Sequence, residues 1–241
     1  MQKKDSQMLA HYQFDALGGA DHGWLKAKHH FSFASYHDPQ KMGFGELLVI
    51  NDDIIAPHTG FDTHPHRDME IITYVRRGAI SHKDSTGNEG RTTSGNVQVM
   101  SAGTGIFHSE FNHEDEDTNI YQIWIKPRSR GIAPRWDTAE FPRAPAHDAL
   151  ALLVSGDGNA PLSINQDARI YAGRMQAGTQ LTHHISGQAY LLVSDGSLLV
   201  DGNLATKGDG IAISDQPSVG LSAEEACEVL VIEVPGLVSA R

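Results

Sequence analysis

The sequence predicts an all-β protein made of two β domains in tandem. Glycine accounts for 24 of the 241 residues, about 10% against an average near 7%. Short apolar runs rich in Val, Ile, Leu and Tyr recur along the chain, and Gly, Asp, Asn or Pro bounds most of them. Long amphipathic helical patterns are absent from the sequence. Short apolar runs separated by turn residues in this way are typical of β-barrels and sandwiches.

The apolar runs also predict where the strands and the domain boundary lie. The segment 127–145 contains four prolines and little periodicity, so we expect it to connect two halves. We therefore place an N-terminal domain, with an N-terminal extension and the connector, at residues 1–140 and a C-terminal domain at 141–241. The expected strands cover residues 45–50, 69–75, 79–83, 97–100, 119–125, 151–154, 170–175, 189–193, 197–200, 210–213 and 228–234.

The two halves share one order of features: a strand, a glycine, a second strand, a polar turn, another glycine and a third strand. This order runs from residue 71 to 100 around Gly78 and from residue 190 to 213 around Gly196. Duplication of a β unit is the simplest explanation. We expect only the first half to hold a metal, because the second half has different residues at the matching positions. The alignment equates His64, His66, His108 and Glu110 with Thr182, His184, Leu221 and Ala223.

Two motifs in the first half carry the candidate chemistry. His64 and His66 are two residues apart in GFDTHPHRDME, and His108 and Glu110 have the same spacing in GTGIFHSEFN. Residues two apart in a strand point to the same face, so each pair can converge on one ion. Three imidazoles and one carboxylate suit Fe, Mn, Co, Ni, Cu or Zn better than Mg or Ca. The motifs therefore predict a transition-metal site with coordination positions left for water, dioxygen or a substrate oxygen.

The motifs resemble those of a known family. The pattern GxxxHxHxxxE followed by HxExN is similar to the paired motifs of the cupin superfamily. The runs GWLKAKHHFSFASYHDP, THPHRDMEIITYV, DSTGN and MSAGTGIFHSE resemble the pirin family, most closely its bacterial members assigned quercetin 2,3-dioxygenase activity. The resemblance is dense over residues 20–140 and weak afterwards. It implies a bicupin, two β-barrel or jelly-roll domains in tandem. It also implies one metal, usually iron, in the N-terminal barrel, with His64, His66, His108 and Glu110 as ligands.

The carboxylate ligand has an alternative. Generic cupins take it from the first motif, at the position of Glu70, whereas pirins take it from the second motif, at Glu110. Glu70 shares the strand face of His66 by parity, so it could bind the metal, hold an imidazole or lie at the rim. The resemblance favours Glu110 as the ligand and places Glu70 among the residues that support the ligands.

Charge and composition exclude several classes of partner. The net charge of −11 argues against nucleic-acid binding. The apolar runs are too short to span a membrane, and the N-terminus lacks the apolar stretch of a secretory signal, so we expect a cytoplasmic protein. The single cysteine, Cys227, cannot form an intrachain disulfide, and we expect it to be a buried, inert strand residue.

Several other clusters receive structural interpretations. The acidic run at residues 113–117 is expected to form a solvated loop. His29 and His30 have no recognisable partner for a metal site. We expect Phe31 and Phe33 to fill the core rather than line a pocket.

The resemblance implies an oxidoreductase that opens the heterocyclic ring of a flavonol such as quercetin with O2. In this hypothesis a flavonol hydroxyl reaches the metal, and Glu110 accepts its proton as the catalytic base. A related enol or phenol is an alternative substrate. The alternative function is a non-enzymatic regulator that senses redox state through its metal and binds a partner protein.

Overall fold

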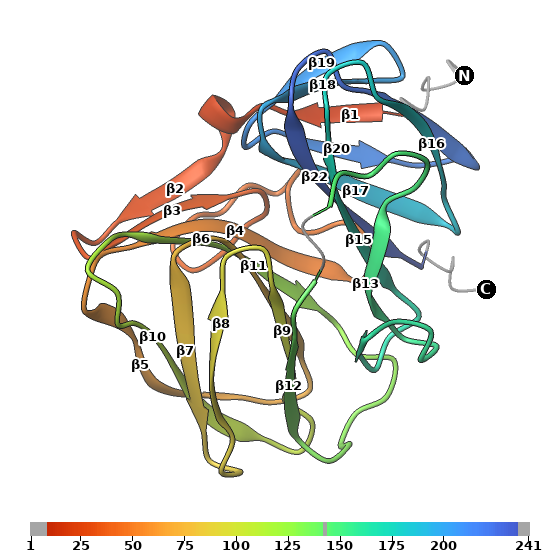
Figure 1. Cartoon of the computed structure of the whole chain (residues 1–241). Coiled ribbons are helices and arrows are strands. Elements are labelled where there is room, and N and C mark those ends of the chain that lie inside the picture. Colours follow the sequence, from red (N-terminus) through yellow and green to blue (C-terminus); the bar gives the residue numbers. More distant parts are fainter. Residues whose placement is uncertain (1–8, 142–143, 236–241) are drawn as a thin grey trace. The chain divides into compact units, whose positions relative to one another are not determined.

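The computed structural model describes residues 9–141 and 144–235, and nearly all of its regular structure is β-strand (Figure 1). The one helical element among these residues is a three-residue 3-10 turn, Phe14–Ala16. The all-β prediction is therefore confirmed. Among the described residues, no helix has the length and apolar character needed to cross a bilayer.

Two compact units make up the described chain. We call residues 17–141 and 153–168 the N-terminal unit, and residues 9–16, 144–152 and 169–235 the C-terminal unit. Neither unit is continuous in sequence.

The N-terminal unit contains a larger and a smaller sheet. The larger sheet has the order β12-β9-β6-β11-β4-β3-β2, and the smaller has the order β5-β10-β7-β8; their strands run from red through yellow to green in Figure 1. The strands are β2 (Gly18–Asp21), β3 (Leu25–His29), β4 (Leu47–Ile55), β5 (Thr59–His66), β6 (Glu70–Arg77), β7 (Ala79–Asp84), β8 (Glu89–Thr93), β9 (Val97–Ser101), β10 (Ile106–Asn112), β11 (Thr118–Ile125), β12 (Arg135–Ala139) and β14 (Leu162–Ser163).

The core of the N-terminal unit forms where the central strands carry apolar side chains on both faces. β6 reads EIITYVRR, with its first six residues buried, as expected for a strand covered on two sides. One apolar cluster contains Ile55, Val75 and Ile120 with Trp24 and Phe61 packed against them. A second contains Ile71, Met100 and Ile106 with Trp124 and Trp136. Burial of these side chains fixes the sheets that carry the candidate site.

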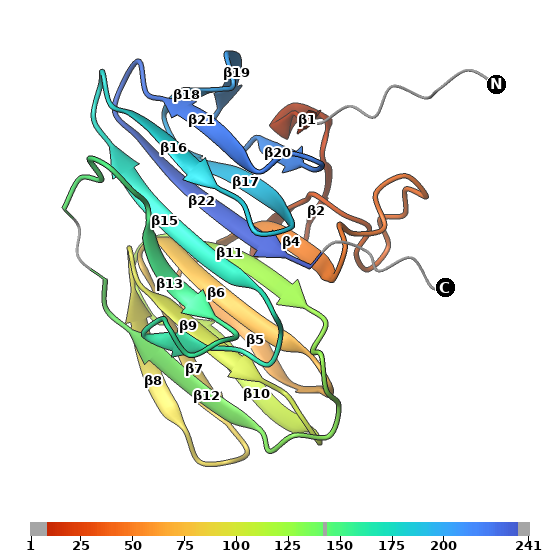
Figure 2. The ribbon, with the colours of Figure 1, turned by 90° about the vertical axis from the view of Figure 1, so that its right-hand side faces the viewer.

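The C-terminal unit repeats this construction. Its larger sheet includes the order β1-β20-β17-β22-β15, and its smaller sheet has the order β16-β21-β18-β19 (Figure 2). The strands are β1 (Leu9–Tyr12), β15 (Arg169–Met175), β16 (Gln180–His184), β17 (Gln188–Asp195), β18 (Ser197–Val200), β19 (Asn203–Thr206), β20 (Gly210–Ile213), β21 (Ser218–Ser222) and β22 (Cys227–Val234). One further strand, β13 (Ala151–Ser155), contains the point at residues 152–153 where the chain passes from the C-terminal unit to the N-terminal unit.

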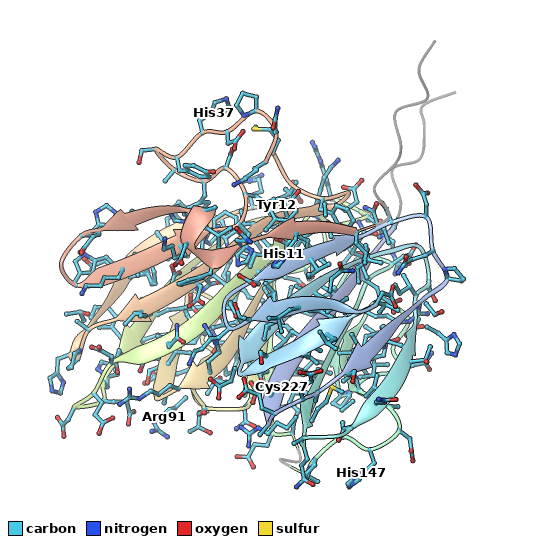
Figure 3. The ribbon with its side chains drawn as sticks, turned by 90° about the horizontal axis from the view of Figure 1, so that it is seen from above. His11, Tyr12, His37, Arg91, His147 and Cys227 are labelled. Atoms are coloured by element: carbon cyan, nitrogen blue, oxygen red, sulfur yellow. The ribbon has the colours of Figure 1, made fainter. Side chains whose placement is uncertain are left out.

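The units differ from the continuous domains 1–140 and 141–241 suggested by the sequence. β1 runs antiparallel to β20 inside the C-terminal unit, and Figure 3 labels its residues His11 and Tyr12. Residues 153–168 belong to the N-terminal unit, where the backbone N–H of Arg128 donates to the carbonyl oxygen of Asn165 (2.8 Å). The placement of β1 in the C-terminal unit and of residues 153–168 in the N-terminal unit depends on strand pairing or loop contacts between residues far apart in sequence.

The segment 127–145 is more ordered than a connector. It contains β12, which adds to the edge of the larger sheet by pairing Trp136 with Met100 of β9. The segment expected to connect the halves therefore also contributes an edge strand, which needs only one buried face and shows little periodicity. Residues 142–143 lie outside the described residues. The acidic run at 113–117 joins β10 to β11 and is mostly exposed, as expected.

The alignment of the two halves was wrong by one residue at β16. Leu181 and His183 are buried there, whereas Thr182 and His184 are exposed. A shift of one residue in a strand moves every side chain to the other face. The interior histidine is therefore His183, whose Nε2 lies 2.9 Å from Oε1 of Glu233. Apolar side chains, including Leu181 and Leu221, fill the surrounding core.

Candidate metal centre

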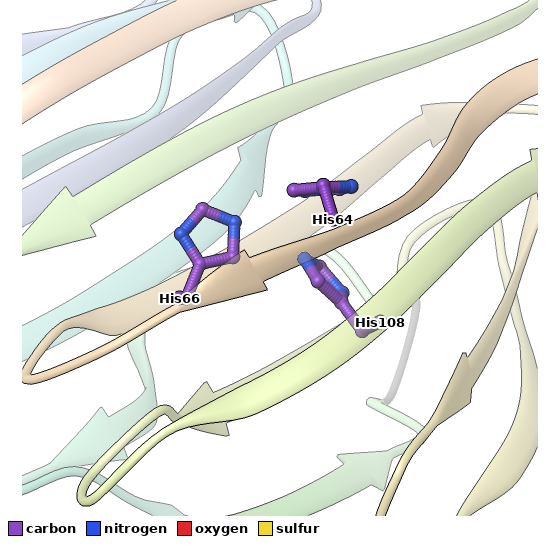
Figure 4. Close-up of side chains that lie close together, drawn as sticks. All are labelled: His64, His66 and His108. Carbon is purple, nitrogen blue, oxygen red and sulfur yellow. The ribbon is translucent and has the colours of Figure 1, made fainter.

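Three histidines converge on the inner side of the smaller sheet of the N-terminal unit. His64 and His66 lie on β5, and His108 lies on β10 directly opposite His64 in the antiparallel pair. One ligand atom from each ring lies within 4.8 Å of the others. The ring centroids are 4.4 Å apart for His64 and His108 and 4.8 Å apart for His64 and His66, and Figure 4 shows the three rings facing one another. The structure thus brings together the three imidazoles expected from the sequence.

A β-bulge on β5 sets the direction of the His64 side chain. His108 pairs with His64, but Glu110 pairs with Phe61, so two residues of β5 oppose one of β10. The backbone carbonyl of Asp62, inside this bulge, lies 2.7 Å from Nδ1 of His64. A carbonyl oxygen only accepts hydrogen bonds, so Nδ1 of His64 carries the proton and Nε2 keeps its lone pair.

Burial keeps the other two imidazoles neutral. Burial, followed by the nearby His64, lowers the pKa of His66 to about 4. Burial, followed by the neighbouring histidines, lowers the pKa of His108 to about 2. The Nε2 atom of His108 is buried and has no hydrogen-bond partner among the described residues. Metals bind neutral imidazoles through such lone pairs, so the cluster fits a divalent transition metal.

Glu110 lies beside the cluster, held by three amide and hydroxyl groups. Its Oε1 accepts hydrogen bonds from Thr73 Oγ1 (3.0 Å) and Gln98 Nε2 (2.6 Å), and its Oε2 accepts one from Gln122 Nε2 (2.5 Å). Burial raises the pKa of this carboxyl to about 7 in spite of these bonds. Glu110 is not part of the described group whose ligand atoms lie mutually within 4.8 Å. Its role as a ligand remains a prediction.

Glu70 does not hold an imidazole, so that alternative was wrong. Its Oε2 accepts hydrogen bonds from Ser101 Oγ (2.6 Å) and from the backbone N–H of Asn165 (3.1 Å). The chain turns at Asp68, whose φ is 48°, and Glu70 begins a strand of the other sheet. Counting alternate residues from His66 therefore does not predict the direction of the Glu70 side chain, because this turn lies between the two residues. Burial raises the pKa of Glu70, against hydrogen bonds from Ser101 and Asn165.

The histidines open into a cavity of about 360 Å³ inside the N-terminal unit. Its lining combines aliphatic, aromatic and polar side chains from β2, β3, β4, β5, β6, β10 and β11, with parts of the loops before and after β3. The lining residues are Ala20, His22, Leu25, Ala27, His29, Phe33, Ala34, Ser35, Asn51, Asp53, Phe61, His64, His66, Ile71, His108, Glu110, Gln122 and Trp124. A pocket of this size and composition is typical of small-molecule sites.

Aromatic side chains form one wall of the cavity. The ring of Trp124 contacts His66 edge to face at 4.9 Å between centroids and contacts Phe33 at 5.4 Å. Phe31 is buried, as expected, but Phe33 lines the cavity. The expectation that Phe33 fills the core was wrong, because the bridge between Phe33 and Tyr36 folds the loop after β3 over the cavity.

A polar wall was missed by sequence reasoning. Asn51 and Asp53 of β4 and Gln122 of β11 are buried and line the cavity. His29 joins them, with its Nδ1 2.8 Å from Asn51 Oδ1. The expected strand stopped at Ile50, but β4 continues to Ile55. Extending the apolar run through the polar letters NDD, with alternate side chains on one face, could have found the two β4 residues.

Two members of this polar wall, Asp53 and Gln122, each have an oxygen without a hydrogen-bond partner among the described residues. These atoms, Oδ1 of Asp53 and Oε1 of Gln122, are buried. Burial raises the pKa of Asp53 well above its usual range, and the negative charges of Asp52 and Glu110 raise it further. Buried polar atoms without partners mark places where a ligand can form hydrogen bonds.

Comparisons with known proteins agree with the fold and the histidine cluster. A family model described as Pirin matches residues 11–125, and one described as the quercetinase C-terminal cupin domain matches residues 152–234. The expected arrangement of two cupin domains is therefore confirmed.

Individual relatives match almost the whole chain. A protein of Pseudomonas aeruginosa, provisionally named a quercetin 2,3-dioxygenase, is 51% identical over 94% of this chain and 100% of its own. The quercetin 2,3-dioxygenase of Escherichia coli is 41% identical over 90% of this chain and 95% of its own. The crystal structure of the bacterial pirin YhhW from Escherichia coli in complex with nickel(II) is 40% identical, with a TM-score of 0.89, and covers 95% of this chain and 100% of YhhW.

Proposed function

The chain belongs to the pirin family, and we propose that it is a metal-dependent dioxygenase that opens the heterocyclic ring of a flavonol such as quercetin with O2. The observation that carries this proposal is the three-histidine cluster at the wall of an aromatic and polar cavity. Two relatives named as quercetin 2,3-dioxygenases, one of them provisionally, support the choice of substrate.

One divalent metal per chain would be held by His64, His66 and His108, with Glu110 as the carboxylate ligand. Nickel(II) in the related pirin supports a divalent ion. We propose iron, which suits the same nitrogen and oxygen donors. When bound, this metal supplies Lewis acidity and reactivity with dioxygen.

The protein's own residues would bind the flavonol and move its proton. The planar rings would lie beside Trp124 and Phe33, which line the cavity. Hydroxyl groups on the far side of the substrate would donate hydrogen bonds to Asp53 and Gln122, which have unpartnered oxygens. These contacts orient the substrate's hydroxyl towards the histidines.

Glu110 would accept the proton of the flavonol hydroxyl as the catalytic base. It is fixed by hydrogen bonds from Thr73, Gln98 and Gln122, so its carboxyl group does not have to reorganise before proton transfer. The apolar side chains that line part of the cavity would limit the access of bulk water to the reaction.

Metal analysis combined with a quercetin assay tests this function. Protein purified without chelators is expected to contain about one metal per chain and to bleach the quercetin absorption band in air. His64→Ala is expected to lose both properties. Glu110→Gln is expected to stop bleaching. His184→Ala is the matched control, because His184 is exposed on β16 and outside the cluster.

Two results would overturn the proposal. Metal-loaded wild-type protein that leaves quercetin unchanged would exclude the flavonol reaction and favour another phenolic substrate or a metal-sensing regulator. Protein that binds no added iron(II) or nickel(II) would exclude the metal site itself.

A further inference from the structure

A second buried histidine stands behind the candidate metal ligand His108. His82 lies on β7, which pairs with β10 on the side opposite β5. Its Nδ1 is 3.5 Å from Nδ1 of His108, and its Nε2 is 3.1 Å from Oδ2 of Asp84. The ring of His82 stacks on Trp136 with centroids 4.8 Å apart and planes 6° apart. Asp84, His82 and His108 therefore form one continuous chain that ends at the cavity.

Asp84 is held as an ionised acceptor at the outer end of this chain. Its Oδ1 accepts hydrogen bonds from the backbone N–H and the hydroxyl of Thr86 (2.8 and 2.7 Å) and from the backbone N–H of Asn88 (3.1 Å). Its Oδ2 accepts one from Asn88 Nδ2 (3.0 Å). Burial opposes ionisation, but these bonds and the one from His82 outweigh it and hold the pKa of Asp84 well below its usual range.

The carboxylate of Asp84, at the outer end of the chain, determines which nitrogen of His82 and of His108 carries the proton. A carboxylate cannot donate, so His82 must donate through Nε2. With its proton on Nε2, the His82 ring carries its lone pair on Nδ1, which faces Nδ1 of His108 at 3.5 Å. That lone pair can accept only from Nδ1–H of His108. The Nε2 atom of His108 is then left bare, and it is the buried atom that has no partner among the described residues.

We propose that Asp84 and His82 are positioning residues that fix the proton of His108 on Nδ1 and so present its Nε2 to the metal. This inference rests on the proposed metal site but not on the flavonol reaction. In this arrangement His108 carries its proton on Nδ1, as His64 does beside the backbone carbonyl of Asp62. Partners of this kind orient a ligand and raise its basicity.

Asp84→Asn provides a sharp test because it changes the end of the chain from acceptor to donor. An amide that donates to Nε2 of His82 moves the proton of His82 to Nδ1, which then donates to Nδ1 of His108. His108 must now carry its proton on Nε2, where a metal would bind. In metal-free protein, nitrogen-15 NMR is expected to report this tautomer change at His108. Affinity for nickel(II), measured by chelator competition, is expected to fall about 10- to 100-fold.

Two further variants separate this role from simple support of the loop. Asn88→Ala removes the side-chain hydrogen bond to the same carboxylate but keeps the backbone one and does not touch His82, and nickel(II) affinity is expected to change less than about twofold. His82→Phe keeps a ring against Trp136 but removes both nitrogens, and a loss of affinity similar to that of Asp84→Asn is expected.

The proposal is overturned if Asp84→Asn leaves the His108 tautomer and the affinity unchanged. It is also overturned if Asn88→Ala lowers affinity as much as Asp84→Asn, since the loop alone would then explain the effect. Neither readout uses quercetin, so failure of the proposed dioxygenase activity would not decide this test.

Discussion

The Nδ1 atom of His64 lies 2.7 Å from the backbone carbonyl oxygen of Asp62, two residues earlier on the same strand. This contact exists because of the bulge that separates the His64–His108 pair from the Phe61–Glu110 pair. A regular strand points successive carbonyls sideways into its ladder, so an imidazole could not bond to the carbonyl of residue i−2. The bulge therefore supplies both the direction and the tautomer of the first histidine.

Gly60 allows β5 to approach β10 closely beside this bulge, so Gly60→Ala is expected to disturb it. A Cβ atom at Gly60 would overlap the backbone carbonyl oxygen of Glu110 and the Cα of Phe111. The strands would have to separate, which we expect to lower the free energy of unfolding by about 1–3 kcal/mol and to weaken nickel(II) binding. Urea unfolding and chelator competition measure the two effects. Thr63→Ala, exposed on the same strand, should change neither, and equal effects in both variants would contradict this role.

The three histidines could be predicted from sequence because two strand pairs and their period of two are local patterns. The bulge could not, because it depends on how β5 aligns with β10, and nothing in the order of residues 59–66 marks the extra residue. Asp84 illustrates the same limit. It was noticed only as part of a DSTGN run, whereas its contact with His82 and thereby with His108 depends on the pairing of β7 with β10.

The fold shows which strands could be predicted from local sequence patterns and which could not. All the strands expected from apolar runs are present, because buried central strands such as β6 and β22 need continuous apolar residues. Edge and rim strands such as β1, β8 and β12 were not foreseen, since half of each faces solvent. The assignment of β1 to the C-terminal unit required a partner about 200 residues away.

Asp53 is expected to determine substrate affinity more than turnover. Asp53→Leu removes both oxygens from the polar wall, so we expect KM for quercetin to rise about tenfold or more with a smaller change in kcat. Asp53→Asn keeps an acceptor and a donor of the same shape and is expected to keep KM within a few-fold. Steady-state kinetics on the two variants measures the difference. Equal KM values in wild type and Asp53→Leu would show that the substrate does not reach this wall.

The same carboxyl group predicts a dependence of stability on pH. Because burial raises the pKa of Asp53 in the folded protein, the folded state binds more protons than the unfolded state between the two pKa values. Its contribution to stability is therefore complete below the unfolded pKa, near 4, and is lost as pH rises through the folded pKa. Urea unfolding of metal-free protein should show a smaller loss with rising pH for Asp53→Asn than for wild type. Parallel curves would contradict this expectation.

Cys227 is expected to be unreactive while the protein is folded. It is buried on β22, at the place labelled in Figure 3, and burial, followed by the charge of Glu225, raises the pKa of its thiol to about 11. The thiolate that attacks disulfide reagents is therefore scarce at neutral pH. A chromogenic disulfide reagent should react only as fast as the C-terminal unit opens, and rapidly in concentrated guanidinium. Fast reaction with the native protein would disprove this.

Asp209 is expected to hold the N-terminal segment on the C-terminal unit. Its carboxylate accepts hydrogen bonds from the backbone N–H of Phe14 (2.8 Å) and of Thr206 (2.9 Å), and it lies 2.9 Å from Nε2 of His11. Asp209→Ala removes these acceptors, and we expect it to lower the opening free energy of β1 by about 1–3 kcal/mol. Hydrogen exchange of the β1 amides, Leu9–Tyr12, measures this local stability.

The effect of Asp209 should also depend on pH, in the direction opposite to that of Asp53. Burial opposes ionisation, but the hydrogen bonds from Thr206, Phe14 and His11 outweigh it and lower the pKa of Asp209. Its stabilisation is therefore present above the unfolded pKa, near 4, and disappears as pH falls through the folded pKa. The difference in β1 exchange between wild type and Asp209→Ala should shrink as the pH falls below about 4. A difference that stays the same well below pH 4 would mean that the charge of Asp209 does not hold β1 in place.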